Sequence, residues 1–121
     1  MTTWNLAGMK SHVFICNGSS CMRKGAEDIT LAIRDEIALL DLDEQIHTTR
    51  TRCNGRCKDA CIVIAYPQGS WYKASNTEIA REIVRNCITQ ENNQHAIYNM
   101  KDGKMILNSK VASITGIDKK K

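Results

Sequence analysis

The stretch CNGRCKDACIVIAYPQGSWY, from Cys53 to Tyr72, decides the fold of this chain. It opens with two cysteines, Cys53 and Cys57, which are separated by a loop that contains a glycine. A continuous apolar run over residues 62–66 follows, and a Pro-Gln-Gly turn then leads into a second short strand. An apolar run bounded by turn residues is typical of a strand that is buried on both faces. The stretch therefore predicts a thiol-bearing loop joined directly to the centre of a sheet.

A second pair of cysteines, Cys16 and Cys21, lies upstream, at the end of a short apolar strand over residues 13–15. Residues 25–40 repeat apolar side chains at helical spacing, and the threonine-rich residues 46–52 predict a strand. A strand, a helix and a strand in one sheet form a right-handed crossover, which leaves the two strands parallel. Parallel strands end at one edge, where open α/β sheets bind ligands. Both cysteine pairs are therefore expected to meet at that edge.

The rest of the chain completes an α/β domain. Apolar residues recur at helical spacing between residues 75 and 88 and predict a second main helix. The turn sequence KDGK at residues 101–104 separates two short apolar segments and predicts a hairpin. We therefore divide the chain into a leader over residues 1–11, a domain over 12–90, and an accessory hairpin with a basic tail over 91–121.

Composition narrows the class of protein. A chain of 121 residues with 42% hydrophobic and 25% charged residues is typical of one globular domain. No apolar run near the N-terminus resembles a signal peptide or a membrane span, so we expect a cytoplasmic protein without membrane contact. Grouped cysteines in that reducing compartment bind metal or carry out redox chemistry. The net charge of +4 comes mostly from the C-terminal tail, and no basic face with interleaved aromatic residues indicates nucleic-acid binding.

Spacing alone leaves the kind of metal centre open. The Cys-x4-Cys and Cys-x3-Cys pairs are wider than the usual zinc pairs, although zinc tolerates two to four intervening residues. Iron–sulfur clusters take four thiolates at varied spacings. A thioredoxin-type dithiol would need Cys-x-x-Cys, and the first pair is too widely spaced for that motif. The sequence offers neither an acid–base pair nor a substrate site, so we expect no enzymatic activity.

The segments ICNGSSC, RCNGRC and YPQGSWY, with the apolar strand between the last two, resemble the thioredoxin-like [2Fe–2S] ferredoxins. That family is related to the thioredoxin-like cluster subunit of respiratory complex I. The resemblance spans about Ser11 to Gln90 in one order. It implies a thioredoxin-like fold with a mixed four-stranded sheet and two main helices, one-electron transfer, and often a homodimer. It also implies a [2Fe–2S] cluster held by Cys16, Cys21, Cys53 and Cys57. Some members accompany anaerobic cobalamin biosynthesis, which makes such a pathway one candidate for this chain.

One position departs from the family, which commonly has Gly-Pro where this chain has Ala60-Cys61. Because Cys61 heads a buried strand, we interpret it as a small apolar residue in preference to a spare ligand. Cys87 lies on the apolar face of the second helix and is expected in the core. Two other functions remain open at this point. One is a zinc-stabilised interaction module on the same fold, and the other is a cluster carrier or sensor in which Cys61 helps to release the cluster.

Basic residues surround both cysteine loops, and Asp59 is the only acid among them. We call this set the basic rim; its members are Arg23, Lys24, Arg50, Arg52, Arg56 and Lys58. Cations near a negatively charged cluster favour its reduced state and steer an acidic partner toward it. The rim therefore predicts an acidic redox protein as the partner.

Overall fold

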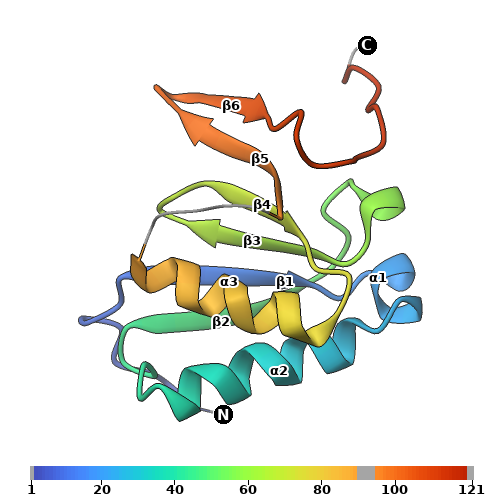
Figure 1. Cartoon of the computed structure of the whole chain (residues 1–121). Helices are drawn as coiled ribbons and strands as arrows, with labels where there is room; N and C mark the ends of the chain where they lie inside the picture. The colour runs from blue at the N-terminus through green and yellow to red at the C-terminus, as the bar shows by residue number, and fades with distance from the viewer. Residues whose placement is uncertain (1, 90–94, 120–121) are drawn as a thin grey trace.

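A six-stranded sheet forms the centre of the computed structural model, which describes residues 2–89 and 95–119 (Figure 1). The domain boundary expected after residue 90 and the last two lysines of the basic tail lie outside the described residues. The elements, in chain order, are β1 (Ser11–Cys16), α1 (Ser19–Arg23), α2 (Ala26–Leu39), β2 (Ile46–Thr51), η1 (Cys57–Asp59), β3 (Ile62–Tyr66), β4 (Ser70–Lys73), α3 (Thr77–Thr89), β5 (Ala96–Lys101) and β6 (Lys104–Leu107).

The strand order β2-β1-β3-β4-β5-β6 gives a mixed sheet. Strands β1 and β2 are parallel, whereas every other neighbouring pair is antiparallel. Cys16 pairs with Thr51, so β1 and β2 end side by side at the same edge of the sheet. The mixed α/β fold and the parallel crossover that the sequence predicts are therefore confirmed.

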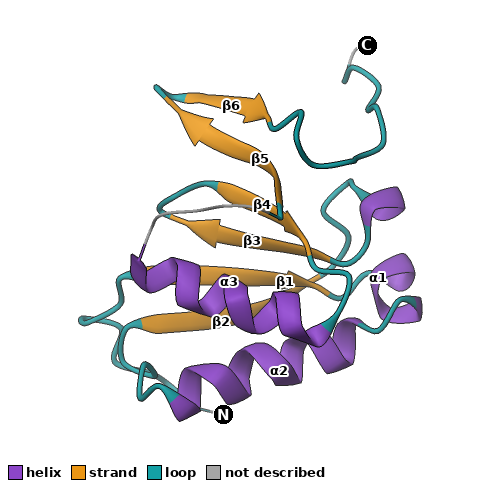
Figure 2. Cartoon of the chain, viewed as in Figure 1, coloured by secondary structure: helices purple, strands orange, loops and turns teal. Residues whose placement is uncertain are grey.

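Alternation along β1 separates the two faces of the sheet. Val13 and Ile15 are fully buried, whereas the alternate residues His12 and Phe14 are only half-buried. The helices α2 and α3 lie side by side on one face, where they cover the fully buried side chains (Figure 2). No helix among the described residues has the length and apolar character needed to cross a bilayer.

A buried carboxylate fastens α2 to α3. Glu36 of α2 is buried, and its two oxygens accept hydrogen bonds from Arg81 at 3.0 Å and from Arg85 at 2.9 Å, both on α3. A buried charge needs such partners because an unpaired one carries a large desolvation penalty. These ion pairs therefore hold the two helices together as one layer over the sheet.

The C-terminal hairpin is present as β5–β6, and it is continuous with the sheet. Trp71 of β4 pairs with Tyr98 of β5, which extends the expected four-stranded sheet to six strands. Without that pairing, β4 would be an edge strand with unpaired backbone groups. The short helices α1 and η1 were not expected from the sequence, and they contain Cys21 and Cys57.

Candidate metal centre

The two cysteine loops meet at the edge of the sheet where β1 and β2 end. The Asn17 N–H donates to the carbonyl oxygen of Thr51 at 2.8 Å, and the Cys16 thiol lies 3.5 Å from the carbonyl oxygen of Arg52. Gly18 approaches the second loop so closely that a Cβ there would lie 2.9 Å from the Cα of Cys53. The crossover therefore brings both pairs to one place, and glycine at residue 18 permits the contact.

The first pair, Cys16 and Cys21, is buried. Burial, together with a smaller contribution from a hydrogen bond with the Cys16 thiol, raises the pKa of the Cys21 thiol to about 12. The thiolate is the form that binds metal, so ligation at Cys21 requires loss of a firmly held proton. A metal bound at this pair would be shielded from water, and its binding would release protons.

The second pair, Cys53 and Cys57, is exposed at the surface, and the two Sγ atoms lie 3.1 Å apart. The Gly55 N–H donates to the Cys53 Sγ at 3.3 Å, which a φ of +84° at this glycine makes possible. This hydrogen bond lowers the pKa of Cys53, and the neighbouring Cys57 thiol lowers it further. The same contact raises the pKa of Cys57. Cys53 is therefore the first of the two to become a thiolate.

The two cysteine pairs lie close enough for one to shift the pKa values of the other. Cys16 contributes to the raised pKa of both Cys21 and Cys57, and the Ser20 hydroxyl of α1 hydrogen-bonds Cys57. Within residues 2–89 and 95–119, no three His, Cys, Asp or Glu side chains gather closely enough to hold a single metal ion. The donors form two pairs instead. Each iron of a [2Fe–2S] cluster takes two thiolates besides the bridging sulfides, so this donor set fits such a cluster.

Cys61 is a fifth thiol close to the first pair, and it is occupied by other contacts. Its side chain is buried and donates to the carbonyl oxygens of Cys21 at 3.4 Å and Lys24 at 3.5 Å. Burial raises the pKa of this thiol, and the nearby Cys16 contributes. Cys87 lies in the core beneath α3, where burial raises its pKa to about 11. Cys61 therefore holds the end of α1 in place. The interpretation of Cys61 as a small apolar residue does not predict these contacts.

The basic rim is partly neutralised. Arg50 pairs with Glu27 of α2 at 2.5 Å, and Arg56 pairs with the buried Asp59. Among the residues that the structure describes, the remaining rim cations make no ion pair; they are Arg23, Lys24, Arg52 and Lys58. Net positive charge at the site therefore comes from four side chains rather than six.

Asp59 is the residue that sequence reasoning missed. Its side chain is only 1% exposed, and its carboxylate also accepts a hydrogen bond from the distant Ile114 N–H at 3.1 Å. The signal in the sequence was an acid placed three residues after an arginine and immediately before a buried strand. Its partner in the C-terminal tail could not be found from spacing.

Comparison with known proteins identifies the family. No family model matches the chain. A protein of Priestia megaterium named "Putative 2Fe-2S ferredoxin" is 51% identical over 126 residues, which cover 100% of this chain and 96% of that protein. "Ferredoxin, 2Fe-2S" of Clostridium pasteurianum is 31% identical over 87 residues, which cover 65% of this chain and 85% of that protein. The crystal structure of the wild-type thioredoxin-like [2Fe–2S] ferredoxin from Aquifex aeolicus matches with a TM-score of 0.65 and 25% identity, over 74% of this chain and 97% of that one.

Sequence, fold and donor chemistry agree. The relative that matches the whole chain is named as a 2Fe-2S ferredoxin, the similar solved structure has the same sheet-and-helix fold, and the two loops supply paired thiols. A [2Fe–2S] cluster exchanges one electron at a time, so the chain is an electron carrier. It belongs to the family of thioredoxin-like [2Fe–2S] ferredoxins.

Proposed function

We propose that Cys16, Cys21, Cys53 and Cys57 are the four ligands of the cluster in this electron-transfer protein. The observation that carries the proposal is their arrangement in two pairs on touching loops. A bound [2Fe–2S] cluster supplies the redox centre, and the chain supplies its environment. Cys61 is left out of the ligand set because it belongs to neither pair and its buried thiol lies within hydrogen-bond distance of the carbonyl oxygens of Cys21 and Lys24.

The two pairs give the proposed centre a buried side and an open side. Cys16 and Cys21 lie beneath the surface, whereas Cys53 and Cys57 are exposed. Electron transfer weakens steeply with distance, so a redox partner exchanges electrons most readily at the exposed pair. The Gly55 N–H stabilises negative charge on the Cys53 sulfur, and hydrogen bonds to the sulfurs are among the factors that set the reduction potential.

Serine substitutions test the ligand set. Serine at any of the four proposed ligands is expected to remove the cluster or change its visible spectrum, because a hydroxyl is a poor substitute for a thiolate ligand. Cys61→Ser and Cys87→Ser are matched controls, since both change a buried thiol that we do not assign as a ligand. A Cys61→Ser protein without a cluster, beside a Cys57→Ser protein that keeps its normal spectrum, would show that the assignment is wrong.

Two alternatives predict different products of purification without air. A zinc module is colourless and contains zinc without iron or sulfide, whereas the cluster gives a red-brown protein with two irons and two sulfides per chain. The pairing of the thiols supports the cluster, because structural zinc needs four donors around one ion. A cluster carrier would instead transfer its cluster to an apo-acceptor, and the buried, hydrogen-bonded Cys61 supports a retained cluster.

The partner is proposed to be an acidic redox protein. Four rim cations flank the two loops and make no ion pair with any residue that the structure describes, which supports this choice; they are Arg23, Lys24, Arg52 and Lys58. Steering by opposite charge raises the association rate, and salt screens it. Electron-transfer rates measured against ionic strength test the proposal, and a rate independent of salt would contradict it.

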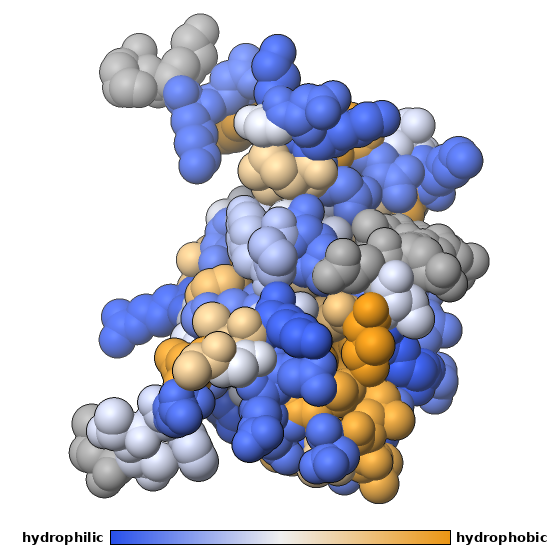
Figure 3. Space-filling view, turned by 90° about the vertical axis from the view of Figure 1, so that its left-hand side faces the viewer, coloured by the Kyte–Doolittle hydropathy of each residue, from blue (hydrophilic) through white to orange (hydrophobic). Residues whose placement is uncertain are grey.

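A homodimer is proposed through an apolar surface far from the cysteine loops. Figure 3 shows apolar side chains gathered over the C-terminal ends of α2 and α3, where Leu39, Leu40 and Ile88 are 70%, 41% and 51% exposed. An exposed apolar cluster of this kind supports a contact with a second copy. Contact at this end leaves the cysteine loops of both copies free for partners. Sedimentation of Leu39→Glu/Ile88→Glu protein tests it, and an unchanged mass would exclude this surface.

The remaining proposals concern organisation and context. We propose that residues 12–90 carry the cluster function and that residues 91–121 form an accessory unit attached to the sheet. We further propose a cytoplasmic protein without an enzymatic activity of its own. Six cysteines without a disulfide support a reducing compartment. Service to a biosynthetic pathway such as cobalamin synthesis stays a prediction, which growth of a deletion strain with and without cobalamin would test.

A further inference from the structure

A buried acid lies immediately beside the exposed cysteine pair. Asp59 ends η1, two residues after Cys57, and none of its surface reaches solvent. Its carboxylate pairs with Arg56, lies 4.0 Å from the Nζ of Lys73, and accepts the N–H of Ile114 at 3.1 Å. A carboxylate buried this completely needs a full set of partners. One of those partners is a backbone group from the far end of the chain.

Arg56 contacts the same residue of the tail from the other side. Its Nη2 donates to the carbonyl oxygen of Ile114 at 2.7 Å, and its guanidinium lies over the ring of Tyr98 at 5.4 Å. The N–H and C=O of Ile114 are therefore both bound, as they are when an extended residue pairs within a sheet. The Ile114 side chain is 48% exposed. Recognition thus depends on the main chain and not on the side chain.

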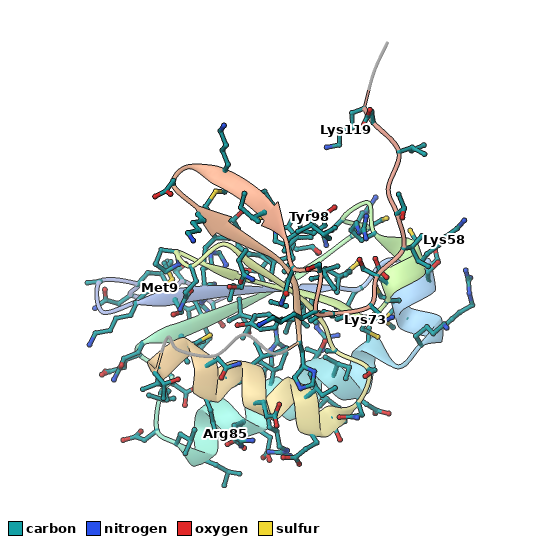
Figure 4. All side chains as sticks on the ribbon, turned by 45° about the horizontal axis from the view of Figure 1, so that its top comes forward. Met9, Lys58, Lys73, Arg85, Tyr98 and Lys119 are labelled. Carbon is teal, nitrogen blue, oxygen red and sulfur yellow. The ribbon has the colours of Figure 1, made fainter. Side chains whose placement is uncertain are left out.

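A turn at Asn108 directs the tail to this contact. The Asn108 N–H donates to the carbonyl oxygen of Ile97 at 2.7 Å, its Nδ2 donates to that of Ala96 at 3.0 Å, and its own carbonyl accepts from the Val111 N–H at 3.2 Å. The segment then rises past η1, between the labelled Tyr98 and Lys58, toward Lys119 (Figure 4). The tail is therefore held at two points, one at each end of residues 108–114.

Between these points Val111 packs partly against the core, whereas residues 114–119 are exposed. A cavity of about 1010 Å³ lies beneath it, with Trp71 and Tyr98 among its lining residues. Because the side chains beyond Val111 bury little apolar surface, the position of residues 113–116 depends on the polar contacts at Ile114. The close approach of Gly116, where an added Cβ would lie 2.9 Å from the Nη1 of Arg56, shows that the backbone passes directly over the guanidinium.

We propose that Arg56 and Asp59 form a binding site for an extended peptide segment, and that residues 113–116 of the same chain fill it. Because the two residues flank Cys57, the bound segment also steadies the second cysteine loop and slows loss of the cluster. The first step of this proposal, the binding of residues 113–116 by Arg56 and Asp59, is independent of which cysteines are ligands. The second step rests on the proposed role of Cys57, which the serine series tests separately.

The test compares two proline substitutions in the cluster-bearing, full-length protein. Ile114→Pro removes the N–H that Asp59 accepts, while Ile117→Pro, at a side chain 96% exposed, makes the same chemical change where no hydrogen bond is lost. Trypsin cleavage after the exposed Lys110 reports release of the tail, because cleavage needs local opening. We expect cleavage to be about tenfold faster in Ile114→Pro and unchanged in Ile117→Pro.

Three results would overturn the peptide site. The first is cleavage of Ile114→Pro at the wild-type rate, and the second is equal acceleration of cleavage by both proline substitutions. The third is a protection of Lys110 in the wild-type protein that falls on dilution, because it would mean that a second copy supplies the segment. For the second step, we expect the cluster to bleach faster with a chelator in Ile114→Pro than in Ile117→Pro. If Cys57→Ser loses its cluster, so that Cys57 is a ligand, and the two proline variants still bleach at the same rate, the proposal that the tail steadies the second cysteine loop is refuted.

Discussion

Removal of the Asp59 charge should destabilise the protein strongly. Asp59→Asn keeps the shape of the side chain and an acceptor for Ile114, but it leaves Arg56 without its counter-ion. The two side chains are 1% and 14% exposed, so the pair lies in surroundings of low dielectric constant. Breaking a buried ion pair by removing one partner costs about 3–5 kcal/mol, and the retained acceptor places Asp59→Asn near the lower value. For a chain of 121 residues, a loss of about 3 kcal/mol lowers the melting temperature by roughly 12 °C.

Urea denaturation of the apo-protein in reducing buffer measures this loss without a contribution from the cluster. Asp118→Asn, an exposed acid of the tail, is the matched control and should change the free energy of unfolding by less than about 0.5 kcal/mol. Arg56→Gln should cost more than Asp59→Asn, because the acid that it leaves with only the more distant Lys73 as counter-ion is the more deeply buried group. The double variant should cost less than the sum, by about 1–3 kcal/mol. A loss below about 1 kcal/mol for Asp59→Asn, or strict additivity, would refute the reasoning.

Three further predictions follow from the burial and charge of single side chains. Cys87→Ser should lower the free energy of unfolding by about 1–3 kcal/mol, because it places a hydroxyl in the core, and should leave the visible spectrum unchanged. Arg52→Gln/Lys58→Gln should lower the reduction potential by about 20–40 mV in voltammetry, because two cations that favour the reduced cluster are lost. Burial raises the pKa of Tyr72 to about 12, above its ordinary value of 10.0. The phenol therefore stabilises the fold fully below pH 10, and that stability is lost as the pH rises toward 12. The Tyr72→Phe protein should lose less stability over this range in denaturation titrations, and an equal loss would contradict the assignment.

The sequence by itself determined the fold and the place where the cysteines meet. Apolar runs and helical spacing follow from local burial, and the handedness of the crossover is a general property of right-twisted sheets. These rules place Cys16 and Cys53 at one edge of the sheet, and the structure has them there. The motif around Cys57 and the hairpin after it identified the family, which the relatives confirm.

Only the tertiary structure decided how the charges around those cysteines are paired. The basic rim looked free in the sequence because Arg50 and Glu27 lie 23 residues apart, and they meet only when the crossover folds α2 over β2. Asp59 and Ile114 are 55 residues apart, and their contact depends on the pairing of β5 with β4 and on the turn at Asn108. Contacts of this kind leave no periodic signal in the sequence. A carboxylate that binds a backbone N–H places no constraint on the side chain of the residue that donates it. The physical reason is that local patterns record which face of an element is buried, whereas the partner of a buried charge is fixed by the packing of the whole chain.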